Sequence, residues 1–403
     1  MQTDNPDLVT VVGVGAGGWA DLGRTPQRAL QAAEVVFGSP RQLDLLPAEV
    51  AAERVAWPSP LLPALPGLLE AHGGRRRAVL ASGDPMFHGI GATLVRLLGA
   101  DRVRALPHPS SASLAAARLG WPLATTEVLS LVTAEPAVLR RSLNPGCRLL
   151  VLARDAGTPA QVAALLADAG YGRATVTVLE QLGGPDERIV AGPADSWPHP
   201  PGDPLAVIGV DCGDGPRSPI VPGLADDAYE SDGQLTKREV RAVTLAALAP
   251  VPGALLWDVG AGSGSIGIEW LRSHPSCRAI AIESHPGRVE TIRRNAARLG
   301  VPGLRIVAGS APAALDGLPA PDTIFVGGGL TRDGVLDACL AALGPGGRLV
   351  ANAVTLETEA VLAAAYAKLG GDLTRLAVNR AAPVGGFTGW RAMMPVTIWS
   401  VTR

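Results

Sequence analysis

The chain has 403 residues, enough for two or three domains, and 47% of them are hydrophobic, which excludes a disordered or fibrous protein. The formal net charge is −2 without long runs of one sign, which argues against a binder of duplex nucleic acid. The four cysteines show no CxxC spacing, which argues against a metal site or a disulfide framework. Because the sequence shows neither a signal-peptide pattern nor an apolar run of about 18 residues, we expect a soluble, cytoplasmic protein without membrane partners.

The first half of the chain predicts buried strands that alternate with helices. The expected strands are the short aliphatic runs 8–14, 78–81, 148–153, 174–179 and 205–210. The expected helices are the Ala/Leu-rich stretches 26–34, 90–98, 113–119 and 161–169. This alternation is typical of α/β layers around a largely parallel sheet.

A glycine-rich loop, VVGVGAGG at 11–18, follows the first expected strand. Its spacing matches a dinucleotide fingerprint, but the next expected helix begins only beyond Thr25, the predicted N-cap, with Pro26 at the first helical position. A loop that does not open directly onto a helix lacks the cradle for a pyrophosphate. The dinucleotide interpretation is therefore disfavoured here.

The pattern stops near residue 210, and residues 211–232 are crowded with Gly, Pro and acidic residues. We expect domains at 1–211 and 232–403, joined by a linker at 212–231. Thr236 and Glu239 form a capping box that predicts a helix to about residue 248. The strands and helices expected beyond it are 254–259, 265–271, 278–283, 288–299, 304–307, 323–326, 335–343, 348–353 and 395–401. They predict a single doubly wound unit.

A second glycine loop carries the strongest local signal. The buried strand that contains Asp258 ends in glycines at alternate positions, Gly260, Gly262 and Gly264, and runs straight into a helix. Such a loop lets the backbone approach a ligand closely. The next strand ends in Glu283, whose carboxylate can accept hydrogen bonds from ribose hydroxyls. The pattern suits either a dinucleotide or S-adenosylmethionine, and an α/β domain that binds no nucleotide remains an alternative.

Two further features favour S-adenosylmethionine. Asp258 stands two positions before the first glycine, where it can reach an ammonium group or order the loop. The segment VAGSAP at 307–312 follows the third strand, where an adenine would lie.

The motifs TKREVRA, WDVGAGSGSIGIEW, AIAIES, GSAP and IFVGGG occur in this order across residues 232–403. In this order they resemble the domains of precorrin C15-methyltransferases (decarboxylating). The resemblance implies a Rossmann-like class I S-adenosylmethionine methyltransferase fold. It also implies cofactor contacts at Thr236, Gly260, Ala261, Gly262, Ser263, Gly264, Glu283 and Ala311.

In the first half, SGDPMFHGIG at 82–91, PHPSS at 107–111 and LEQLGGPDERI at 179–189 resemble the tetrapyrrole methylase family, C5-methyltransferase type, over about residues 8–210. The resemblance implies a fold of two α/β subdomains that bind a folded S-adenosylmethionine where they meet, near 106–112. The implied cofactor or active-site positions are Gly13, Gly15, Gly83, Asp84, Pro85 and Ser111. His108 and Pro109 stand where many relatives have Gly-Val.

Together the two resemblances imply one S-adenosylmethionine per domain and a precorrin tetrapyrrole substrate in cobalamin synthesis. The first half would methylate C5, and the second would methylate C15 and decarboxylate the acetate on ring C, giving precorrin-8X. A sulfonium methyl donor is already activated, so a catalytic triad is unnecessary. Relatives of both halves form oligomers, so we expect a homo-oligomer.

Four residues are candidates for contact with a carboxylate-rich substrate. Arg380 and Arg391 lie in the glycine-rich segment 380–391, expected to be a loop, and a solvated surface loop is an equal alternative. Asn352 and Glu357 follow a strand end, where helix capping is an equal alternative. Three other functions stay open: methylation of another substrate, nicotinamide-dependent oxidoreduction, and sensing of S-adenosylmethionine.

Overall fold

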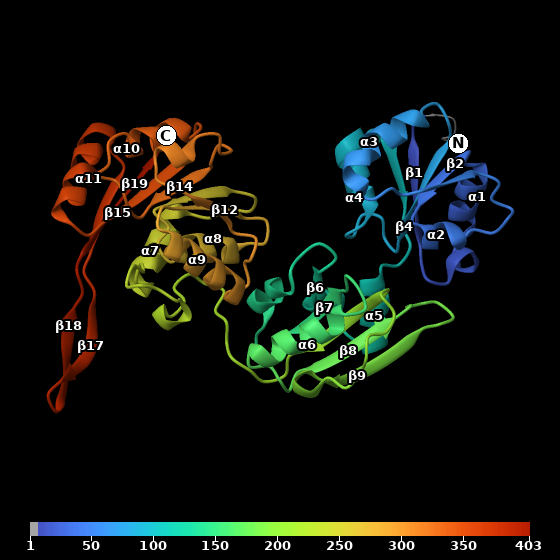
Figure 1. The fold of residues 1–403 in the computed structure, drawn as a ribbon, viewed down its shortest axis with the longest axis horizontal. Helices are drawn as coiled ribbons and strands as arrows, with labels where there is room; N and C mark the ends of the chain where they lie inside the picture. Colours follow the sequence, from blue (N-terminus) through green and yellow to red (C-terminus); the bar gives the residue numbers. More distant parts are fainter. Residues whose placement is uncertain (1–6) are drawn as a thin grey trace. The chain divides into compact units, whose positions relative to one another are not determined.

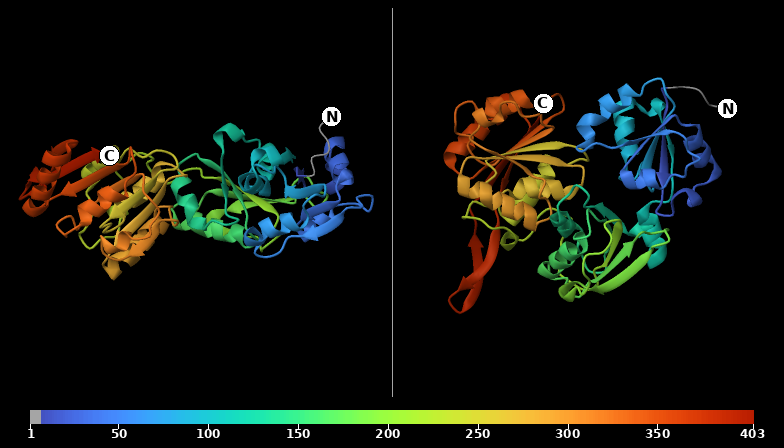
Figure 2. Two further views of the ribbon diagram at one scale, coloured as in Figure 1. Left: turned by 90° about the horizontal axis from the view of Figure 1, so that it is seen from above. Right: turned by 45° about the vertical axis from the view of Figure 1, so that its right-hand side comes forward.

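The computed structural model describes residues 7–403, which form two compact units (Figures 1 and 2). The first unit runs to Pro136 and resumes over Asn144–Pro216, and the second comprises Ala137–Leu143 and Arg217–Arg403. Each unit contains its own hydrophobic clusters. Among the described helices, none is both long and apolar enough to span a bilayer.

The first unit begins with a five-stranded sheet in the order β3-β2-β4-β1-β5, with every pairing parallel. Its strands are β1 (Val9–Val14), β2 (Val35–Gly38), β3 (Glu53–Ala56), β4 (Arg77–Ser82) and β5 (Val103–Leu106). Its helices are α1 (Arg24–Ala32), α2 (Pro40–Asp44), α3 (Leu61–Ala71) and α4 (Ile90–Leu98). Alternate strand residues pack against α1 and α2 on one face and against α3 and α4 on the other.

The second sheet of this unit has the order β6-β7-β10-β8-β9. Its strands are β6 (Glu127–Ser130), β7 (Arg148–Leu152), β8 (Thr175–Glu180), β9 (Arg188–Pro193) and β10 (Ala206–Asp211), with the helices α5 (Ser111–Leu119) and α6 (Thr158–Asp168). Only β6 and β7 are parallel, and the other pairs are antiparallel. The expected largely parallel sheet is therefore right for the first sheet and wrong for the second. The first unit thus contains two sheets, one after the other along the chain and each with its own helices, as expected for two α/β subdomains.

The helix after the first glycine loop begins earlier than expected. Gly23, not Thr25, is the N-cap of α1, because its extended carbonyl accepts a hydrogen bond from the Gln27 N–H at 3.2 Å. A single 3-10 turn, Gly18–Asp21, stands between the loop and α1. The other 3-10 segments are Ala100–Arg102, Leu123–Thr125, Pro136–Ser142, Ala194–Ser196, Asp226–Ala228 and Ala313–Leu315.

The second unit is built on a seven-stranded sheet in the order β13-β12-β11-β14-β15-β19-β16. Its strands are β11 (Leu255–Val259), β12 (Arg278–Glu283), β13 (Arg305–Ala308), β14 (Thr323–Val326), β15 (Arg348–Ala353), β16 (Asp372–Leu376) and β19 (Val396–Thr402). The first five of this order are parallel, whereas β19 is antiparallel to both of its neighbours. One face packs on α7 (Arg238–Leu248), α8 (Ser265–Ser273) and α9 (Pro286–Arg298), and the other on α10 (Val335–Ala342) and α11 (Leu356–Leu369). The doubly wound prediction is confirmed, with a Rossmann-like sheet.

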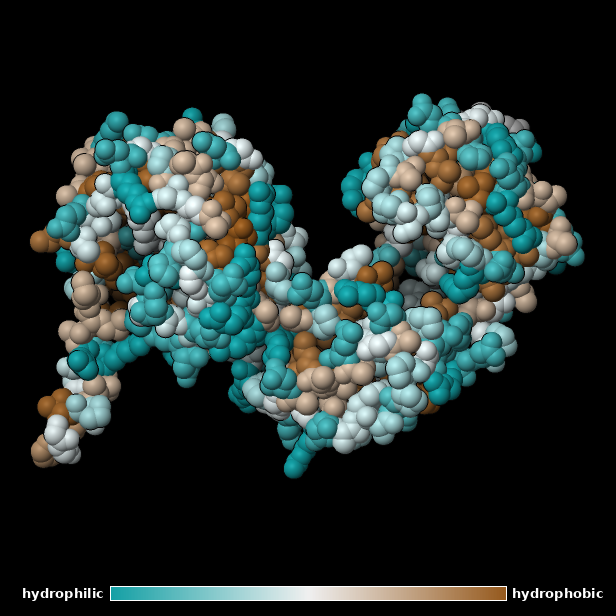
Figure 3. All heavy atoms as spheres, viewed as in Figure 1, coloured by the Kyte–Doolittle hydropathy of each residue, from teal (hydrophilic) through white to brown (hydrophobic). Residues whose placement is uncertain are grey.

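The segment 380–391, expected to be a loop, is a hairpin of β17 (Asn379–Val384) and β18 (Phe387–Ala392), in which Arg380 stands opposite Arg391. The chain reverses at Gly385, whose φ of +59° favours glycine. Figure 3 shows hydrophobic side chains left exposed on this ribbon, where Val384, Phe387 and Trp390 are 62%, 83% and 79% exposed.

The capping box at Thr236 is also a wrong prediction. Helix α7 begins at Arg238, and its N-cap, Lys237, makes no side-chain capping bond. The carbonyl of Thr236 instead accepts a hydrogen bond from the Arg241 guanidinium, and Glu239 pairs with Arg380. The ion pair with Arg380 thus takes the carboxylate that would have closed the box.

Candidate functional site

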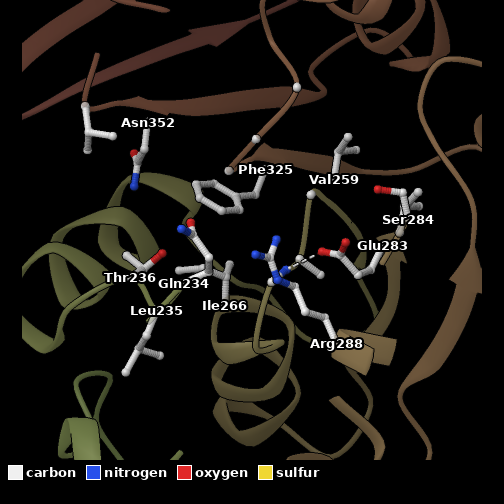
Figure 4. Close-up of a pocket in the computed structure, with 18 of the residues that line it drawn as sticks. Gln234, Leu235, Thr236, Val259, Ile266, Glu283, Ser284, Arg288, Phe325 and Asn352 are labelled. Carbon is white, nitrogen blue, oxygen red and sulfur yellow. Dashed lines mark hydrogen bonds between the residues drawn. The ribbon is translucent and has the colours of Figure 1, made fainter. Parts of the chain in front are cut away.

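A cavity of about 700 Å³ opens in the second unit, where the carboxyl ends of β11, β12 and β14 meet the start of α7 (Figure 4). Ligands of open α/β sheets bind at this edge, because loops that follow parallel strands converge there. In the view of Figure 4, Phe325 lies between Asn352 on one side and Glu283 on the other. The cavity thus has two distinct ends.

The glycine loop forms the floor of one end. Gly260, Gly262 and Gly264 have φ of +71°, +59° and +78°, a left-handed conformation that favours glycine. A Cβ on Gly260 would lie 2.8 Å from the backbone nitrogen of Gly328, so the loop after β11 and the loop after β14 touch through their backbones. A side chain at position 260 would clash with Gly328 and force the two loops apart.

Glu283 fastens the glycine loop to the end of β12. Its side chain is 5% exposed and lines the cavity. One carboxylate oxygen accepts a hydrogen bond from Gly262 N–H and the other from His285 N–H, each at 2.9 Å. Each carboxylate oxygen has two lone pairs, so the group can order the loop and still accept bonds from a ligand's hydroxyls.

Asp258 lies beneath the loop and does not line the cavity. It is fully buried, and its Oδ2 accepts a hydrogen bond from Gly267 N–H at 2.9 Å, while its Oδ1 has no partner among the described residues. Burial raises the pKa of Asp258 to about 7, against the lowering effect of the Gly267 bond. Of the two expected roles, ordering the loop and the start of α8 is the one that this geometry supports.

A buried ion pair holds the segment before α7, which lines the cavity. The Arg241 side chain is 0% exposed, and its Nε donates to Glu269 at 2.6 Å. The same guanidinium donates to the carbonyl of Thr236, which lines the cavity, and Glu269 also accepts from the Tyr229 hydroxyl at 2.9 Å. The segment before α7 is therefore fixed by bonds to the second unit's core.

The structure gathers most of the predicted cofactor residues of this half around the cavity. Those that line it are Thr236, Gly260, Ala261, Gly262, Glu283 and Ala311. Ser263 and Gly264 do not line it: Gly264 is the N-cap of α8, and the carbonyl of Ser263 accepts a hydrogen bond from Asn295 at 2.9 Å.

The candidates for substrate contact separate in the structure. Asn352 lines the cavity, and its Nδ2 donates to Thr244 at 2.9 Å. Helix capping is wrong for Asn352, because Thr355 is the N-cap of α11. Glu357 is exposed in the first turn of α11, where a negative charge suits the helix dipole.

The two arginines of the hairpin do not line the cavity. Arg380 is neutralised by Asp226, at 2.8 Å, and by Glu239, and Arg391 is exposed on β18. Arg380 therefore is not a free cation at the cavity mouth, because two carboxylates from the start of α7 and the segment before it occupy its guanidinium. These contacts come from the tertiary fold and have no local sequence signal.

Sequence reasoning missed several residues that line the cavity. They are Gln234, Leu235, Lys237, Ser284, Arg288, Ser310, Phe325, Arg332, Val354, Met393 and Met394. Ser284 and Phe325 lie inside the motifs AIAIES and IFVGGG and could have been included. Met393 and Met394 directly follow the hairpin, and only the return of the chain to β19 brings them to the cavity.

In the first unit, the predicted motifs converge at the ends of β1 and β4. A Cβ on Gly13 would lie 2.1 Å from the Gly83 carbonyl oxygen and 2.7 Å from the backbone nitrogen of His108. A Cβ on Gly83, whose φ is +60°, would lie 3.4 Å from the backbone nitrogen of Ser111. Three segments that are distant in sequence thus meet backbone to backbone.

Asp84 and Pro85 form the turn that leads into α4. Asp84 Oδ1 accepts a hydrogen bond from Met86 N–H at 2.8 Å, and the Pro85 carbonyl accepts one from Gly91 N–H at 3.0 Å. The imidazole of His108, the departure noted above, lies against Gly15, with Cε1 2.7 Å from where a Cβ on that glycine would stand.

Comparison with known proteins agrees with the family resemblance of each half of the chain. A family model described as tetrapyrrole (corrin/porphyrin) methylases matches residues 8–197, and one described as a precorrin methyltransferase domain matches residues 227–403. A solved structure, the C-terminal domain of precorrin-6Y C5,15-methyltransferase from Rhodobacter capsulatus, is 46% identical, covers 46% of this chain and 100% of its own, and gives a TM-score of 0.44.

Two relatives match along nearly the whole chain. A Mycobacterium tuberculosis protein named precorrin-6Y C(5,15)-methyltransferase (decarboxylating) is 49% identical over 399 residues, 98% of this chain and 100% of that protein. A Sinorhizobium protein of the same name is 48% identical over 98% of this chain and 96% of that protein. The chain therefore belongs to the family of precorrin-6Y C(5,15)-methyltransferases (decarboxylating).

Proposed function

We propose that this enzyme methylates precorrin-6Y at C5 and C15 with S-adenosylmethionine and decarboxylates the acetate on ring C, giving precorrin-8X in cobalamin biosynthesis. The observation that carries the proposal is the 49% identity to a relative of that name along that relative's entire length. The family matches over 8–197 and 227–403 support a tandem of two different methyltransferase domains.

The residues around the second unit's cavity fit S-adenosylmethionine. Gly260 and Gly262 line the cavity with backbone that carries no side chain, and Glu283 offers a buried carboxylate that is held by backbone N–H groups. We propose that Glu283 binds the ribose, and that the backbone at Gly260 and Gly262 lies against the cofactor. Ser310 and Ala311, at the end of β13, would then lie near the adenine. When bound, S-adenosylmethionine supplies a methyl group on a positively charged sulfur.

We propose a division of labour between the two domains, expected at 1–211 and 232–403, with one S-adenosylmethionine in each. The expected linker 212–231 is not wholly a linker, because the chain from Arg217 onward belongs to the second unit, where Leu224 and Tyr229 are buried in the core. The first domain would methylate C5 at the convergence of Gly13, Gly15, Gly83 and Ser111, and the second would methylate C15 and decarboxylate. The backbone contacts of Gly13 with Gly83 and His108 support a single binding region in the first domain.

In the second domain, the chain's own contribution is to orient the substrate and exclude water. Glu283 is the only acidic residue that lines the cavity among those described, and backbone N–H groups already hold its carboxylate. Val354, Met393 and Met394 are among the apolar residues that line the same cavity. An apolar wall removes water from a carboxylate placed against it, which favours the loss of CO₂ as a neutral molecule.

The experiment is incubation of the full chain with precorrin-6Y and S-adenosylmethionine, followed by mass spectrometry. The expected product has gained two methyl groups and lost one CO₂. An unchanged substrate mass, with S-adenosylhomocysteine binding intact, would refute the proposed substrate. We also propose a homo-oligomer, supported by the exposed side chains of Phe387 and Trp390, and light scattering would test it.

A further inference from the structure

The second unit's cavity carries more positive than negative side chains. Its cationic lining residues are Lys237, Arg288 and Arg332, and its acidic one is Glu283. Arg288 is paired with Asp232 at 2.8 Å. Within residues 7–403, neither Lys237 nor Arg332 has an ion-pair partner, and the carboxylate of Glu283 is held by backbone N–H groups. Two of the cations that line this cavity therefore have no ion-pair partner among the described residues.

Both cations stand on backbone that is fixed at the cavity. Lys237 is the N-cap residue of α7, next to Thr236, whose carbonyl is held by Arg241. Arg332 lies in the loop between β14 and α10, where its N–H donates to the Gly329 carbonyl at 3.0 Å and its own carbonyl accepts from Val335 at 3.3 Å. Its Cδ lies 4.0 Å from where a Cβ on Gly329 would stand. The backbone of both cations is thus held in ordered structure at the cavity.

The same cavity also has an apolar lining. Phe325, Val354, Met393, Met394 and Val396 line it, and the flexible thioethers of methionine adapt to a large flat surface. An apolar wall beside two unpaired cations is complementary to a flat apolar ring that carries carboxylates.

We propose that Lys237 and Arg332 bind those carboxylate side chains of the tetrapyrrole that do not react. This inference rests on the proposed function. The carboxylate that leaves as CO₂ is not their partner, because an ion pair would stabilise the very charge that decarboxylation must remove. The two cations therefore determine substrate binding and register, and they affect KM more than kcat.

The test measures C15 methylation and decarboxylation by the full chain as Lys237→Gln, Arg332→Gln and the double variant. Loss of one charge-assisted bond predicts a KM for precorrin-6Y that is about 10-fold higher per variant. The kcat changes by less than about 3-fold, and the Kd of S-adenosylhomocysteine stays the same. Arg332→Lys restores part of the affinity. Arg305→Gln, an exposed arginine on β13 that does not line the cavity, is the matched control and leaves KM unchanged.

A second probe separates this inference from the proposed function. Uroporphyrin, with eight carboxylates, should bind the wild-type chain more tightly than coproporphyrin, with four, and this difference should be smaller in the double variant. Any binding of these porphyrins at the first unit is the same in wild type and variants, so it cancels when the proteins are compared. A chain that binds uroporphyrin in this way but leaves precorrin-6Y unchanged would refute the proposed substrate only.

Two outcomes would overturn the role of the two cations. If KM and uroporphyrin binding are unchanged in the double variant, the cations do not bind substrate. If the Kd of S-adenosylhomocysteine rises as much as KM, the cations hold the cofactor's carboxylate instead.

Discussion

The backbone N–H of Gly262 donates a 2.9 Å hydrogen bond to the carboxylate of Glu283, which joins the loop after β11 to the end of β12. The same carboxylate accepts from His285 N–H, so it is held from both sides at the cofactor end of the cavity. One side chain therefore orders the glycine loop and presents the acceptors expected for a ribose.

Glu283→Ala should raise the Kd of S-adenosylhomocysteine at the second unit by about 10- to 100-fold, because both functions of the carboxylate are lost. Methylation at C15 should fall as the binding of the cofactor weakens. Methylation at C5 serves as the internal control and should continue in the same molecule, measured as a product with one added methyl. Normal C15 methylation by this variant would contradict the assignment of Glu283.

Gly260→Ala should abolish C15 methylation, because the new Cβ would lie 2.8 Å from the backbone of Gly328. Gly317→Ala is a matched control: Gly317 has the same φ of +71°, but a Cβ there meets nothing within 4 Å. In both variants an alanine in the left-handed conformation costs about 1 kcal/mol of stability. The difference in C15 methylation between them therefore reports only the close approach of the two loops. Equal activities, compared by initial rates, would mean that the loop contact is irrelevant.

The raised pKa of Asp258, about 7 against an ordinary 3.8, makes the second unit's stability depend on pH. Between these values the folded state binds more protons than the unfolded state, so the free energy of unfolding falls as pH rises from about 4 to 7 and is level above. The slope approaches about 1.4 kcal/mol per pH unit. Asp258→Asn stays neutral, so its stability relative to wild type should increase across this window.

Hydrogen exchange of peptides from β11 and α8, measured on both proteins between pH 5 and pH 8, would check this dependence after correction for the intrinsic exchange rate. The first unit supplies the control, because its exchange should respond to pH equally in the two proteins. Parallel profiles for wild type and variant would show that Asp258 is ionised throughout.

Gly13→Ala should stop C5 methylation and leave C15 methylation intact, since its Cβ would overlap the Gly83 carbonyl oxygen at 2.1 Å. Gly67→Ala, in α3, places a Cβ in open space and should not reduce the activity. The product masses distinguish the two sites. If Gly13→Ala lost C15 methylation instead, the proposed division of labour would be wrong.

Arg241→Met should destabilise the second unit by about 3–5 kcal/mol, because it leaves the buried carboxylate of Glu269 without its cation. Arg293→Met breaks an ion pair with Glu290 whose side chains are 55% and 59% exposed, and should change stability by at most about 1 kcal/mol. Thermal unfolding of both variants tests this difference. Similar unfolding temperatures would show that the Arg241 cluster is dispensable.

Much of the doubly wound unit could be predicted from sequence. The bounds of β12, β14 and β15, and of α4 in the first unit, match those expected, because these elements have continuous apolar runs or regular helical spacing that local sequence displays. Helix α11 was missed because few of its apolar residues face the core: Leu362 is buried, whereas Leu356 is 79% exposed. The edge strand β3 was missed because it has only four residues and most of them are exposed.

The site was predictable where it follows a strand and unpredictable where it depends on distant contacts. Glu283 ends its strand, Gly260 and Gly262 follow theirs, and the structure places all three at the cavity. Arg380 was expected to be free, but its partners Asp226 and Glu239 lie more than 140 residues earlier. No local pattern reveals which arginine is engaged in an ion pair, as Arg380 is, and which is available to a ligand, as Arg332 is.

The bonds that Glu269 accepts from Gly223, Leu224 and Tyr229 place a limit on how the two activities can be separated. A shorter gene product that retained only the second activity, but began at residue 232, would expose the core beneath these residues and strip a buried carboxylate of its donors. Natural fission or laboratory excision of the C15 enzyme should therefore succeed only upstream of Gly223, in the stretch that follows Asp211 at the end of β10.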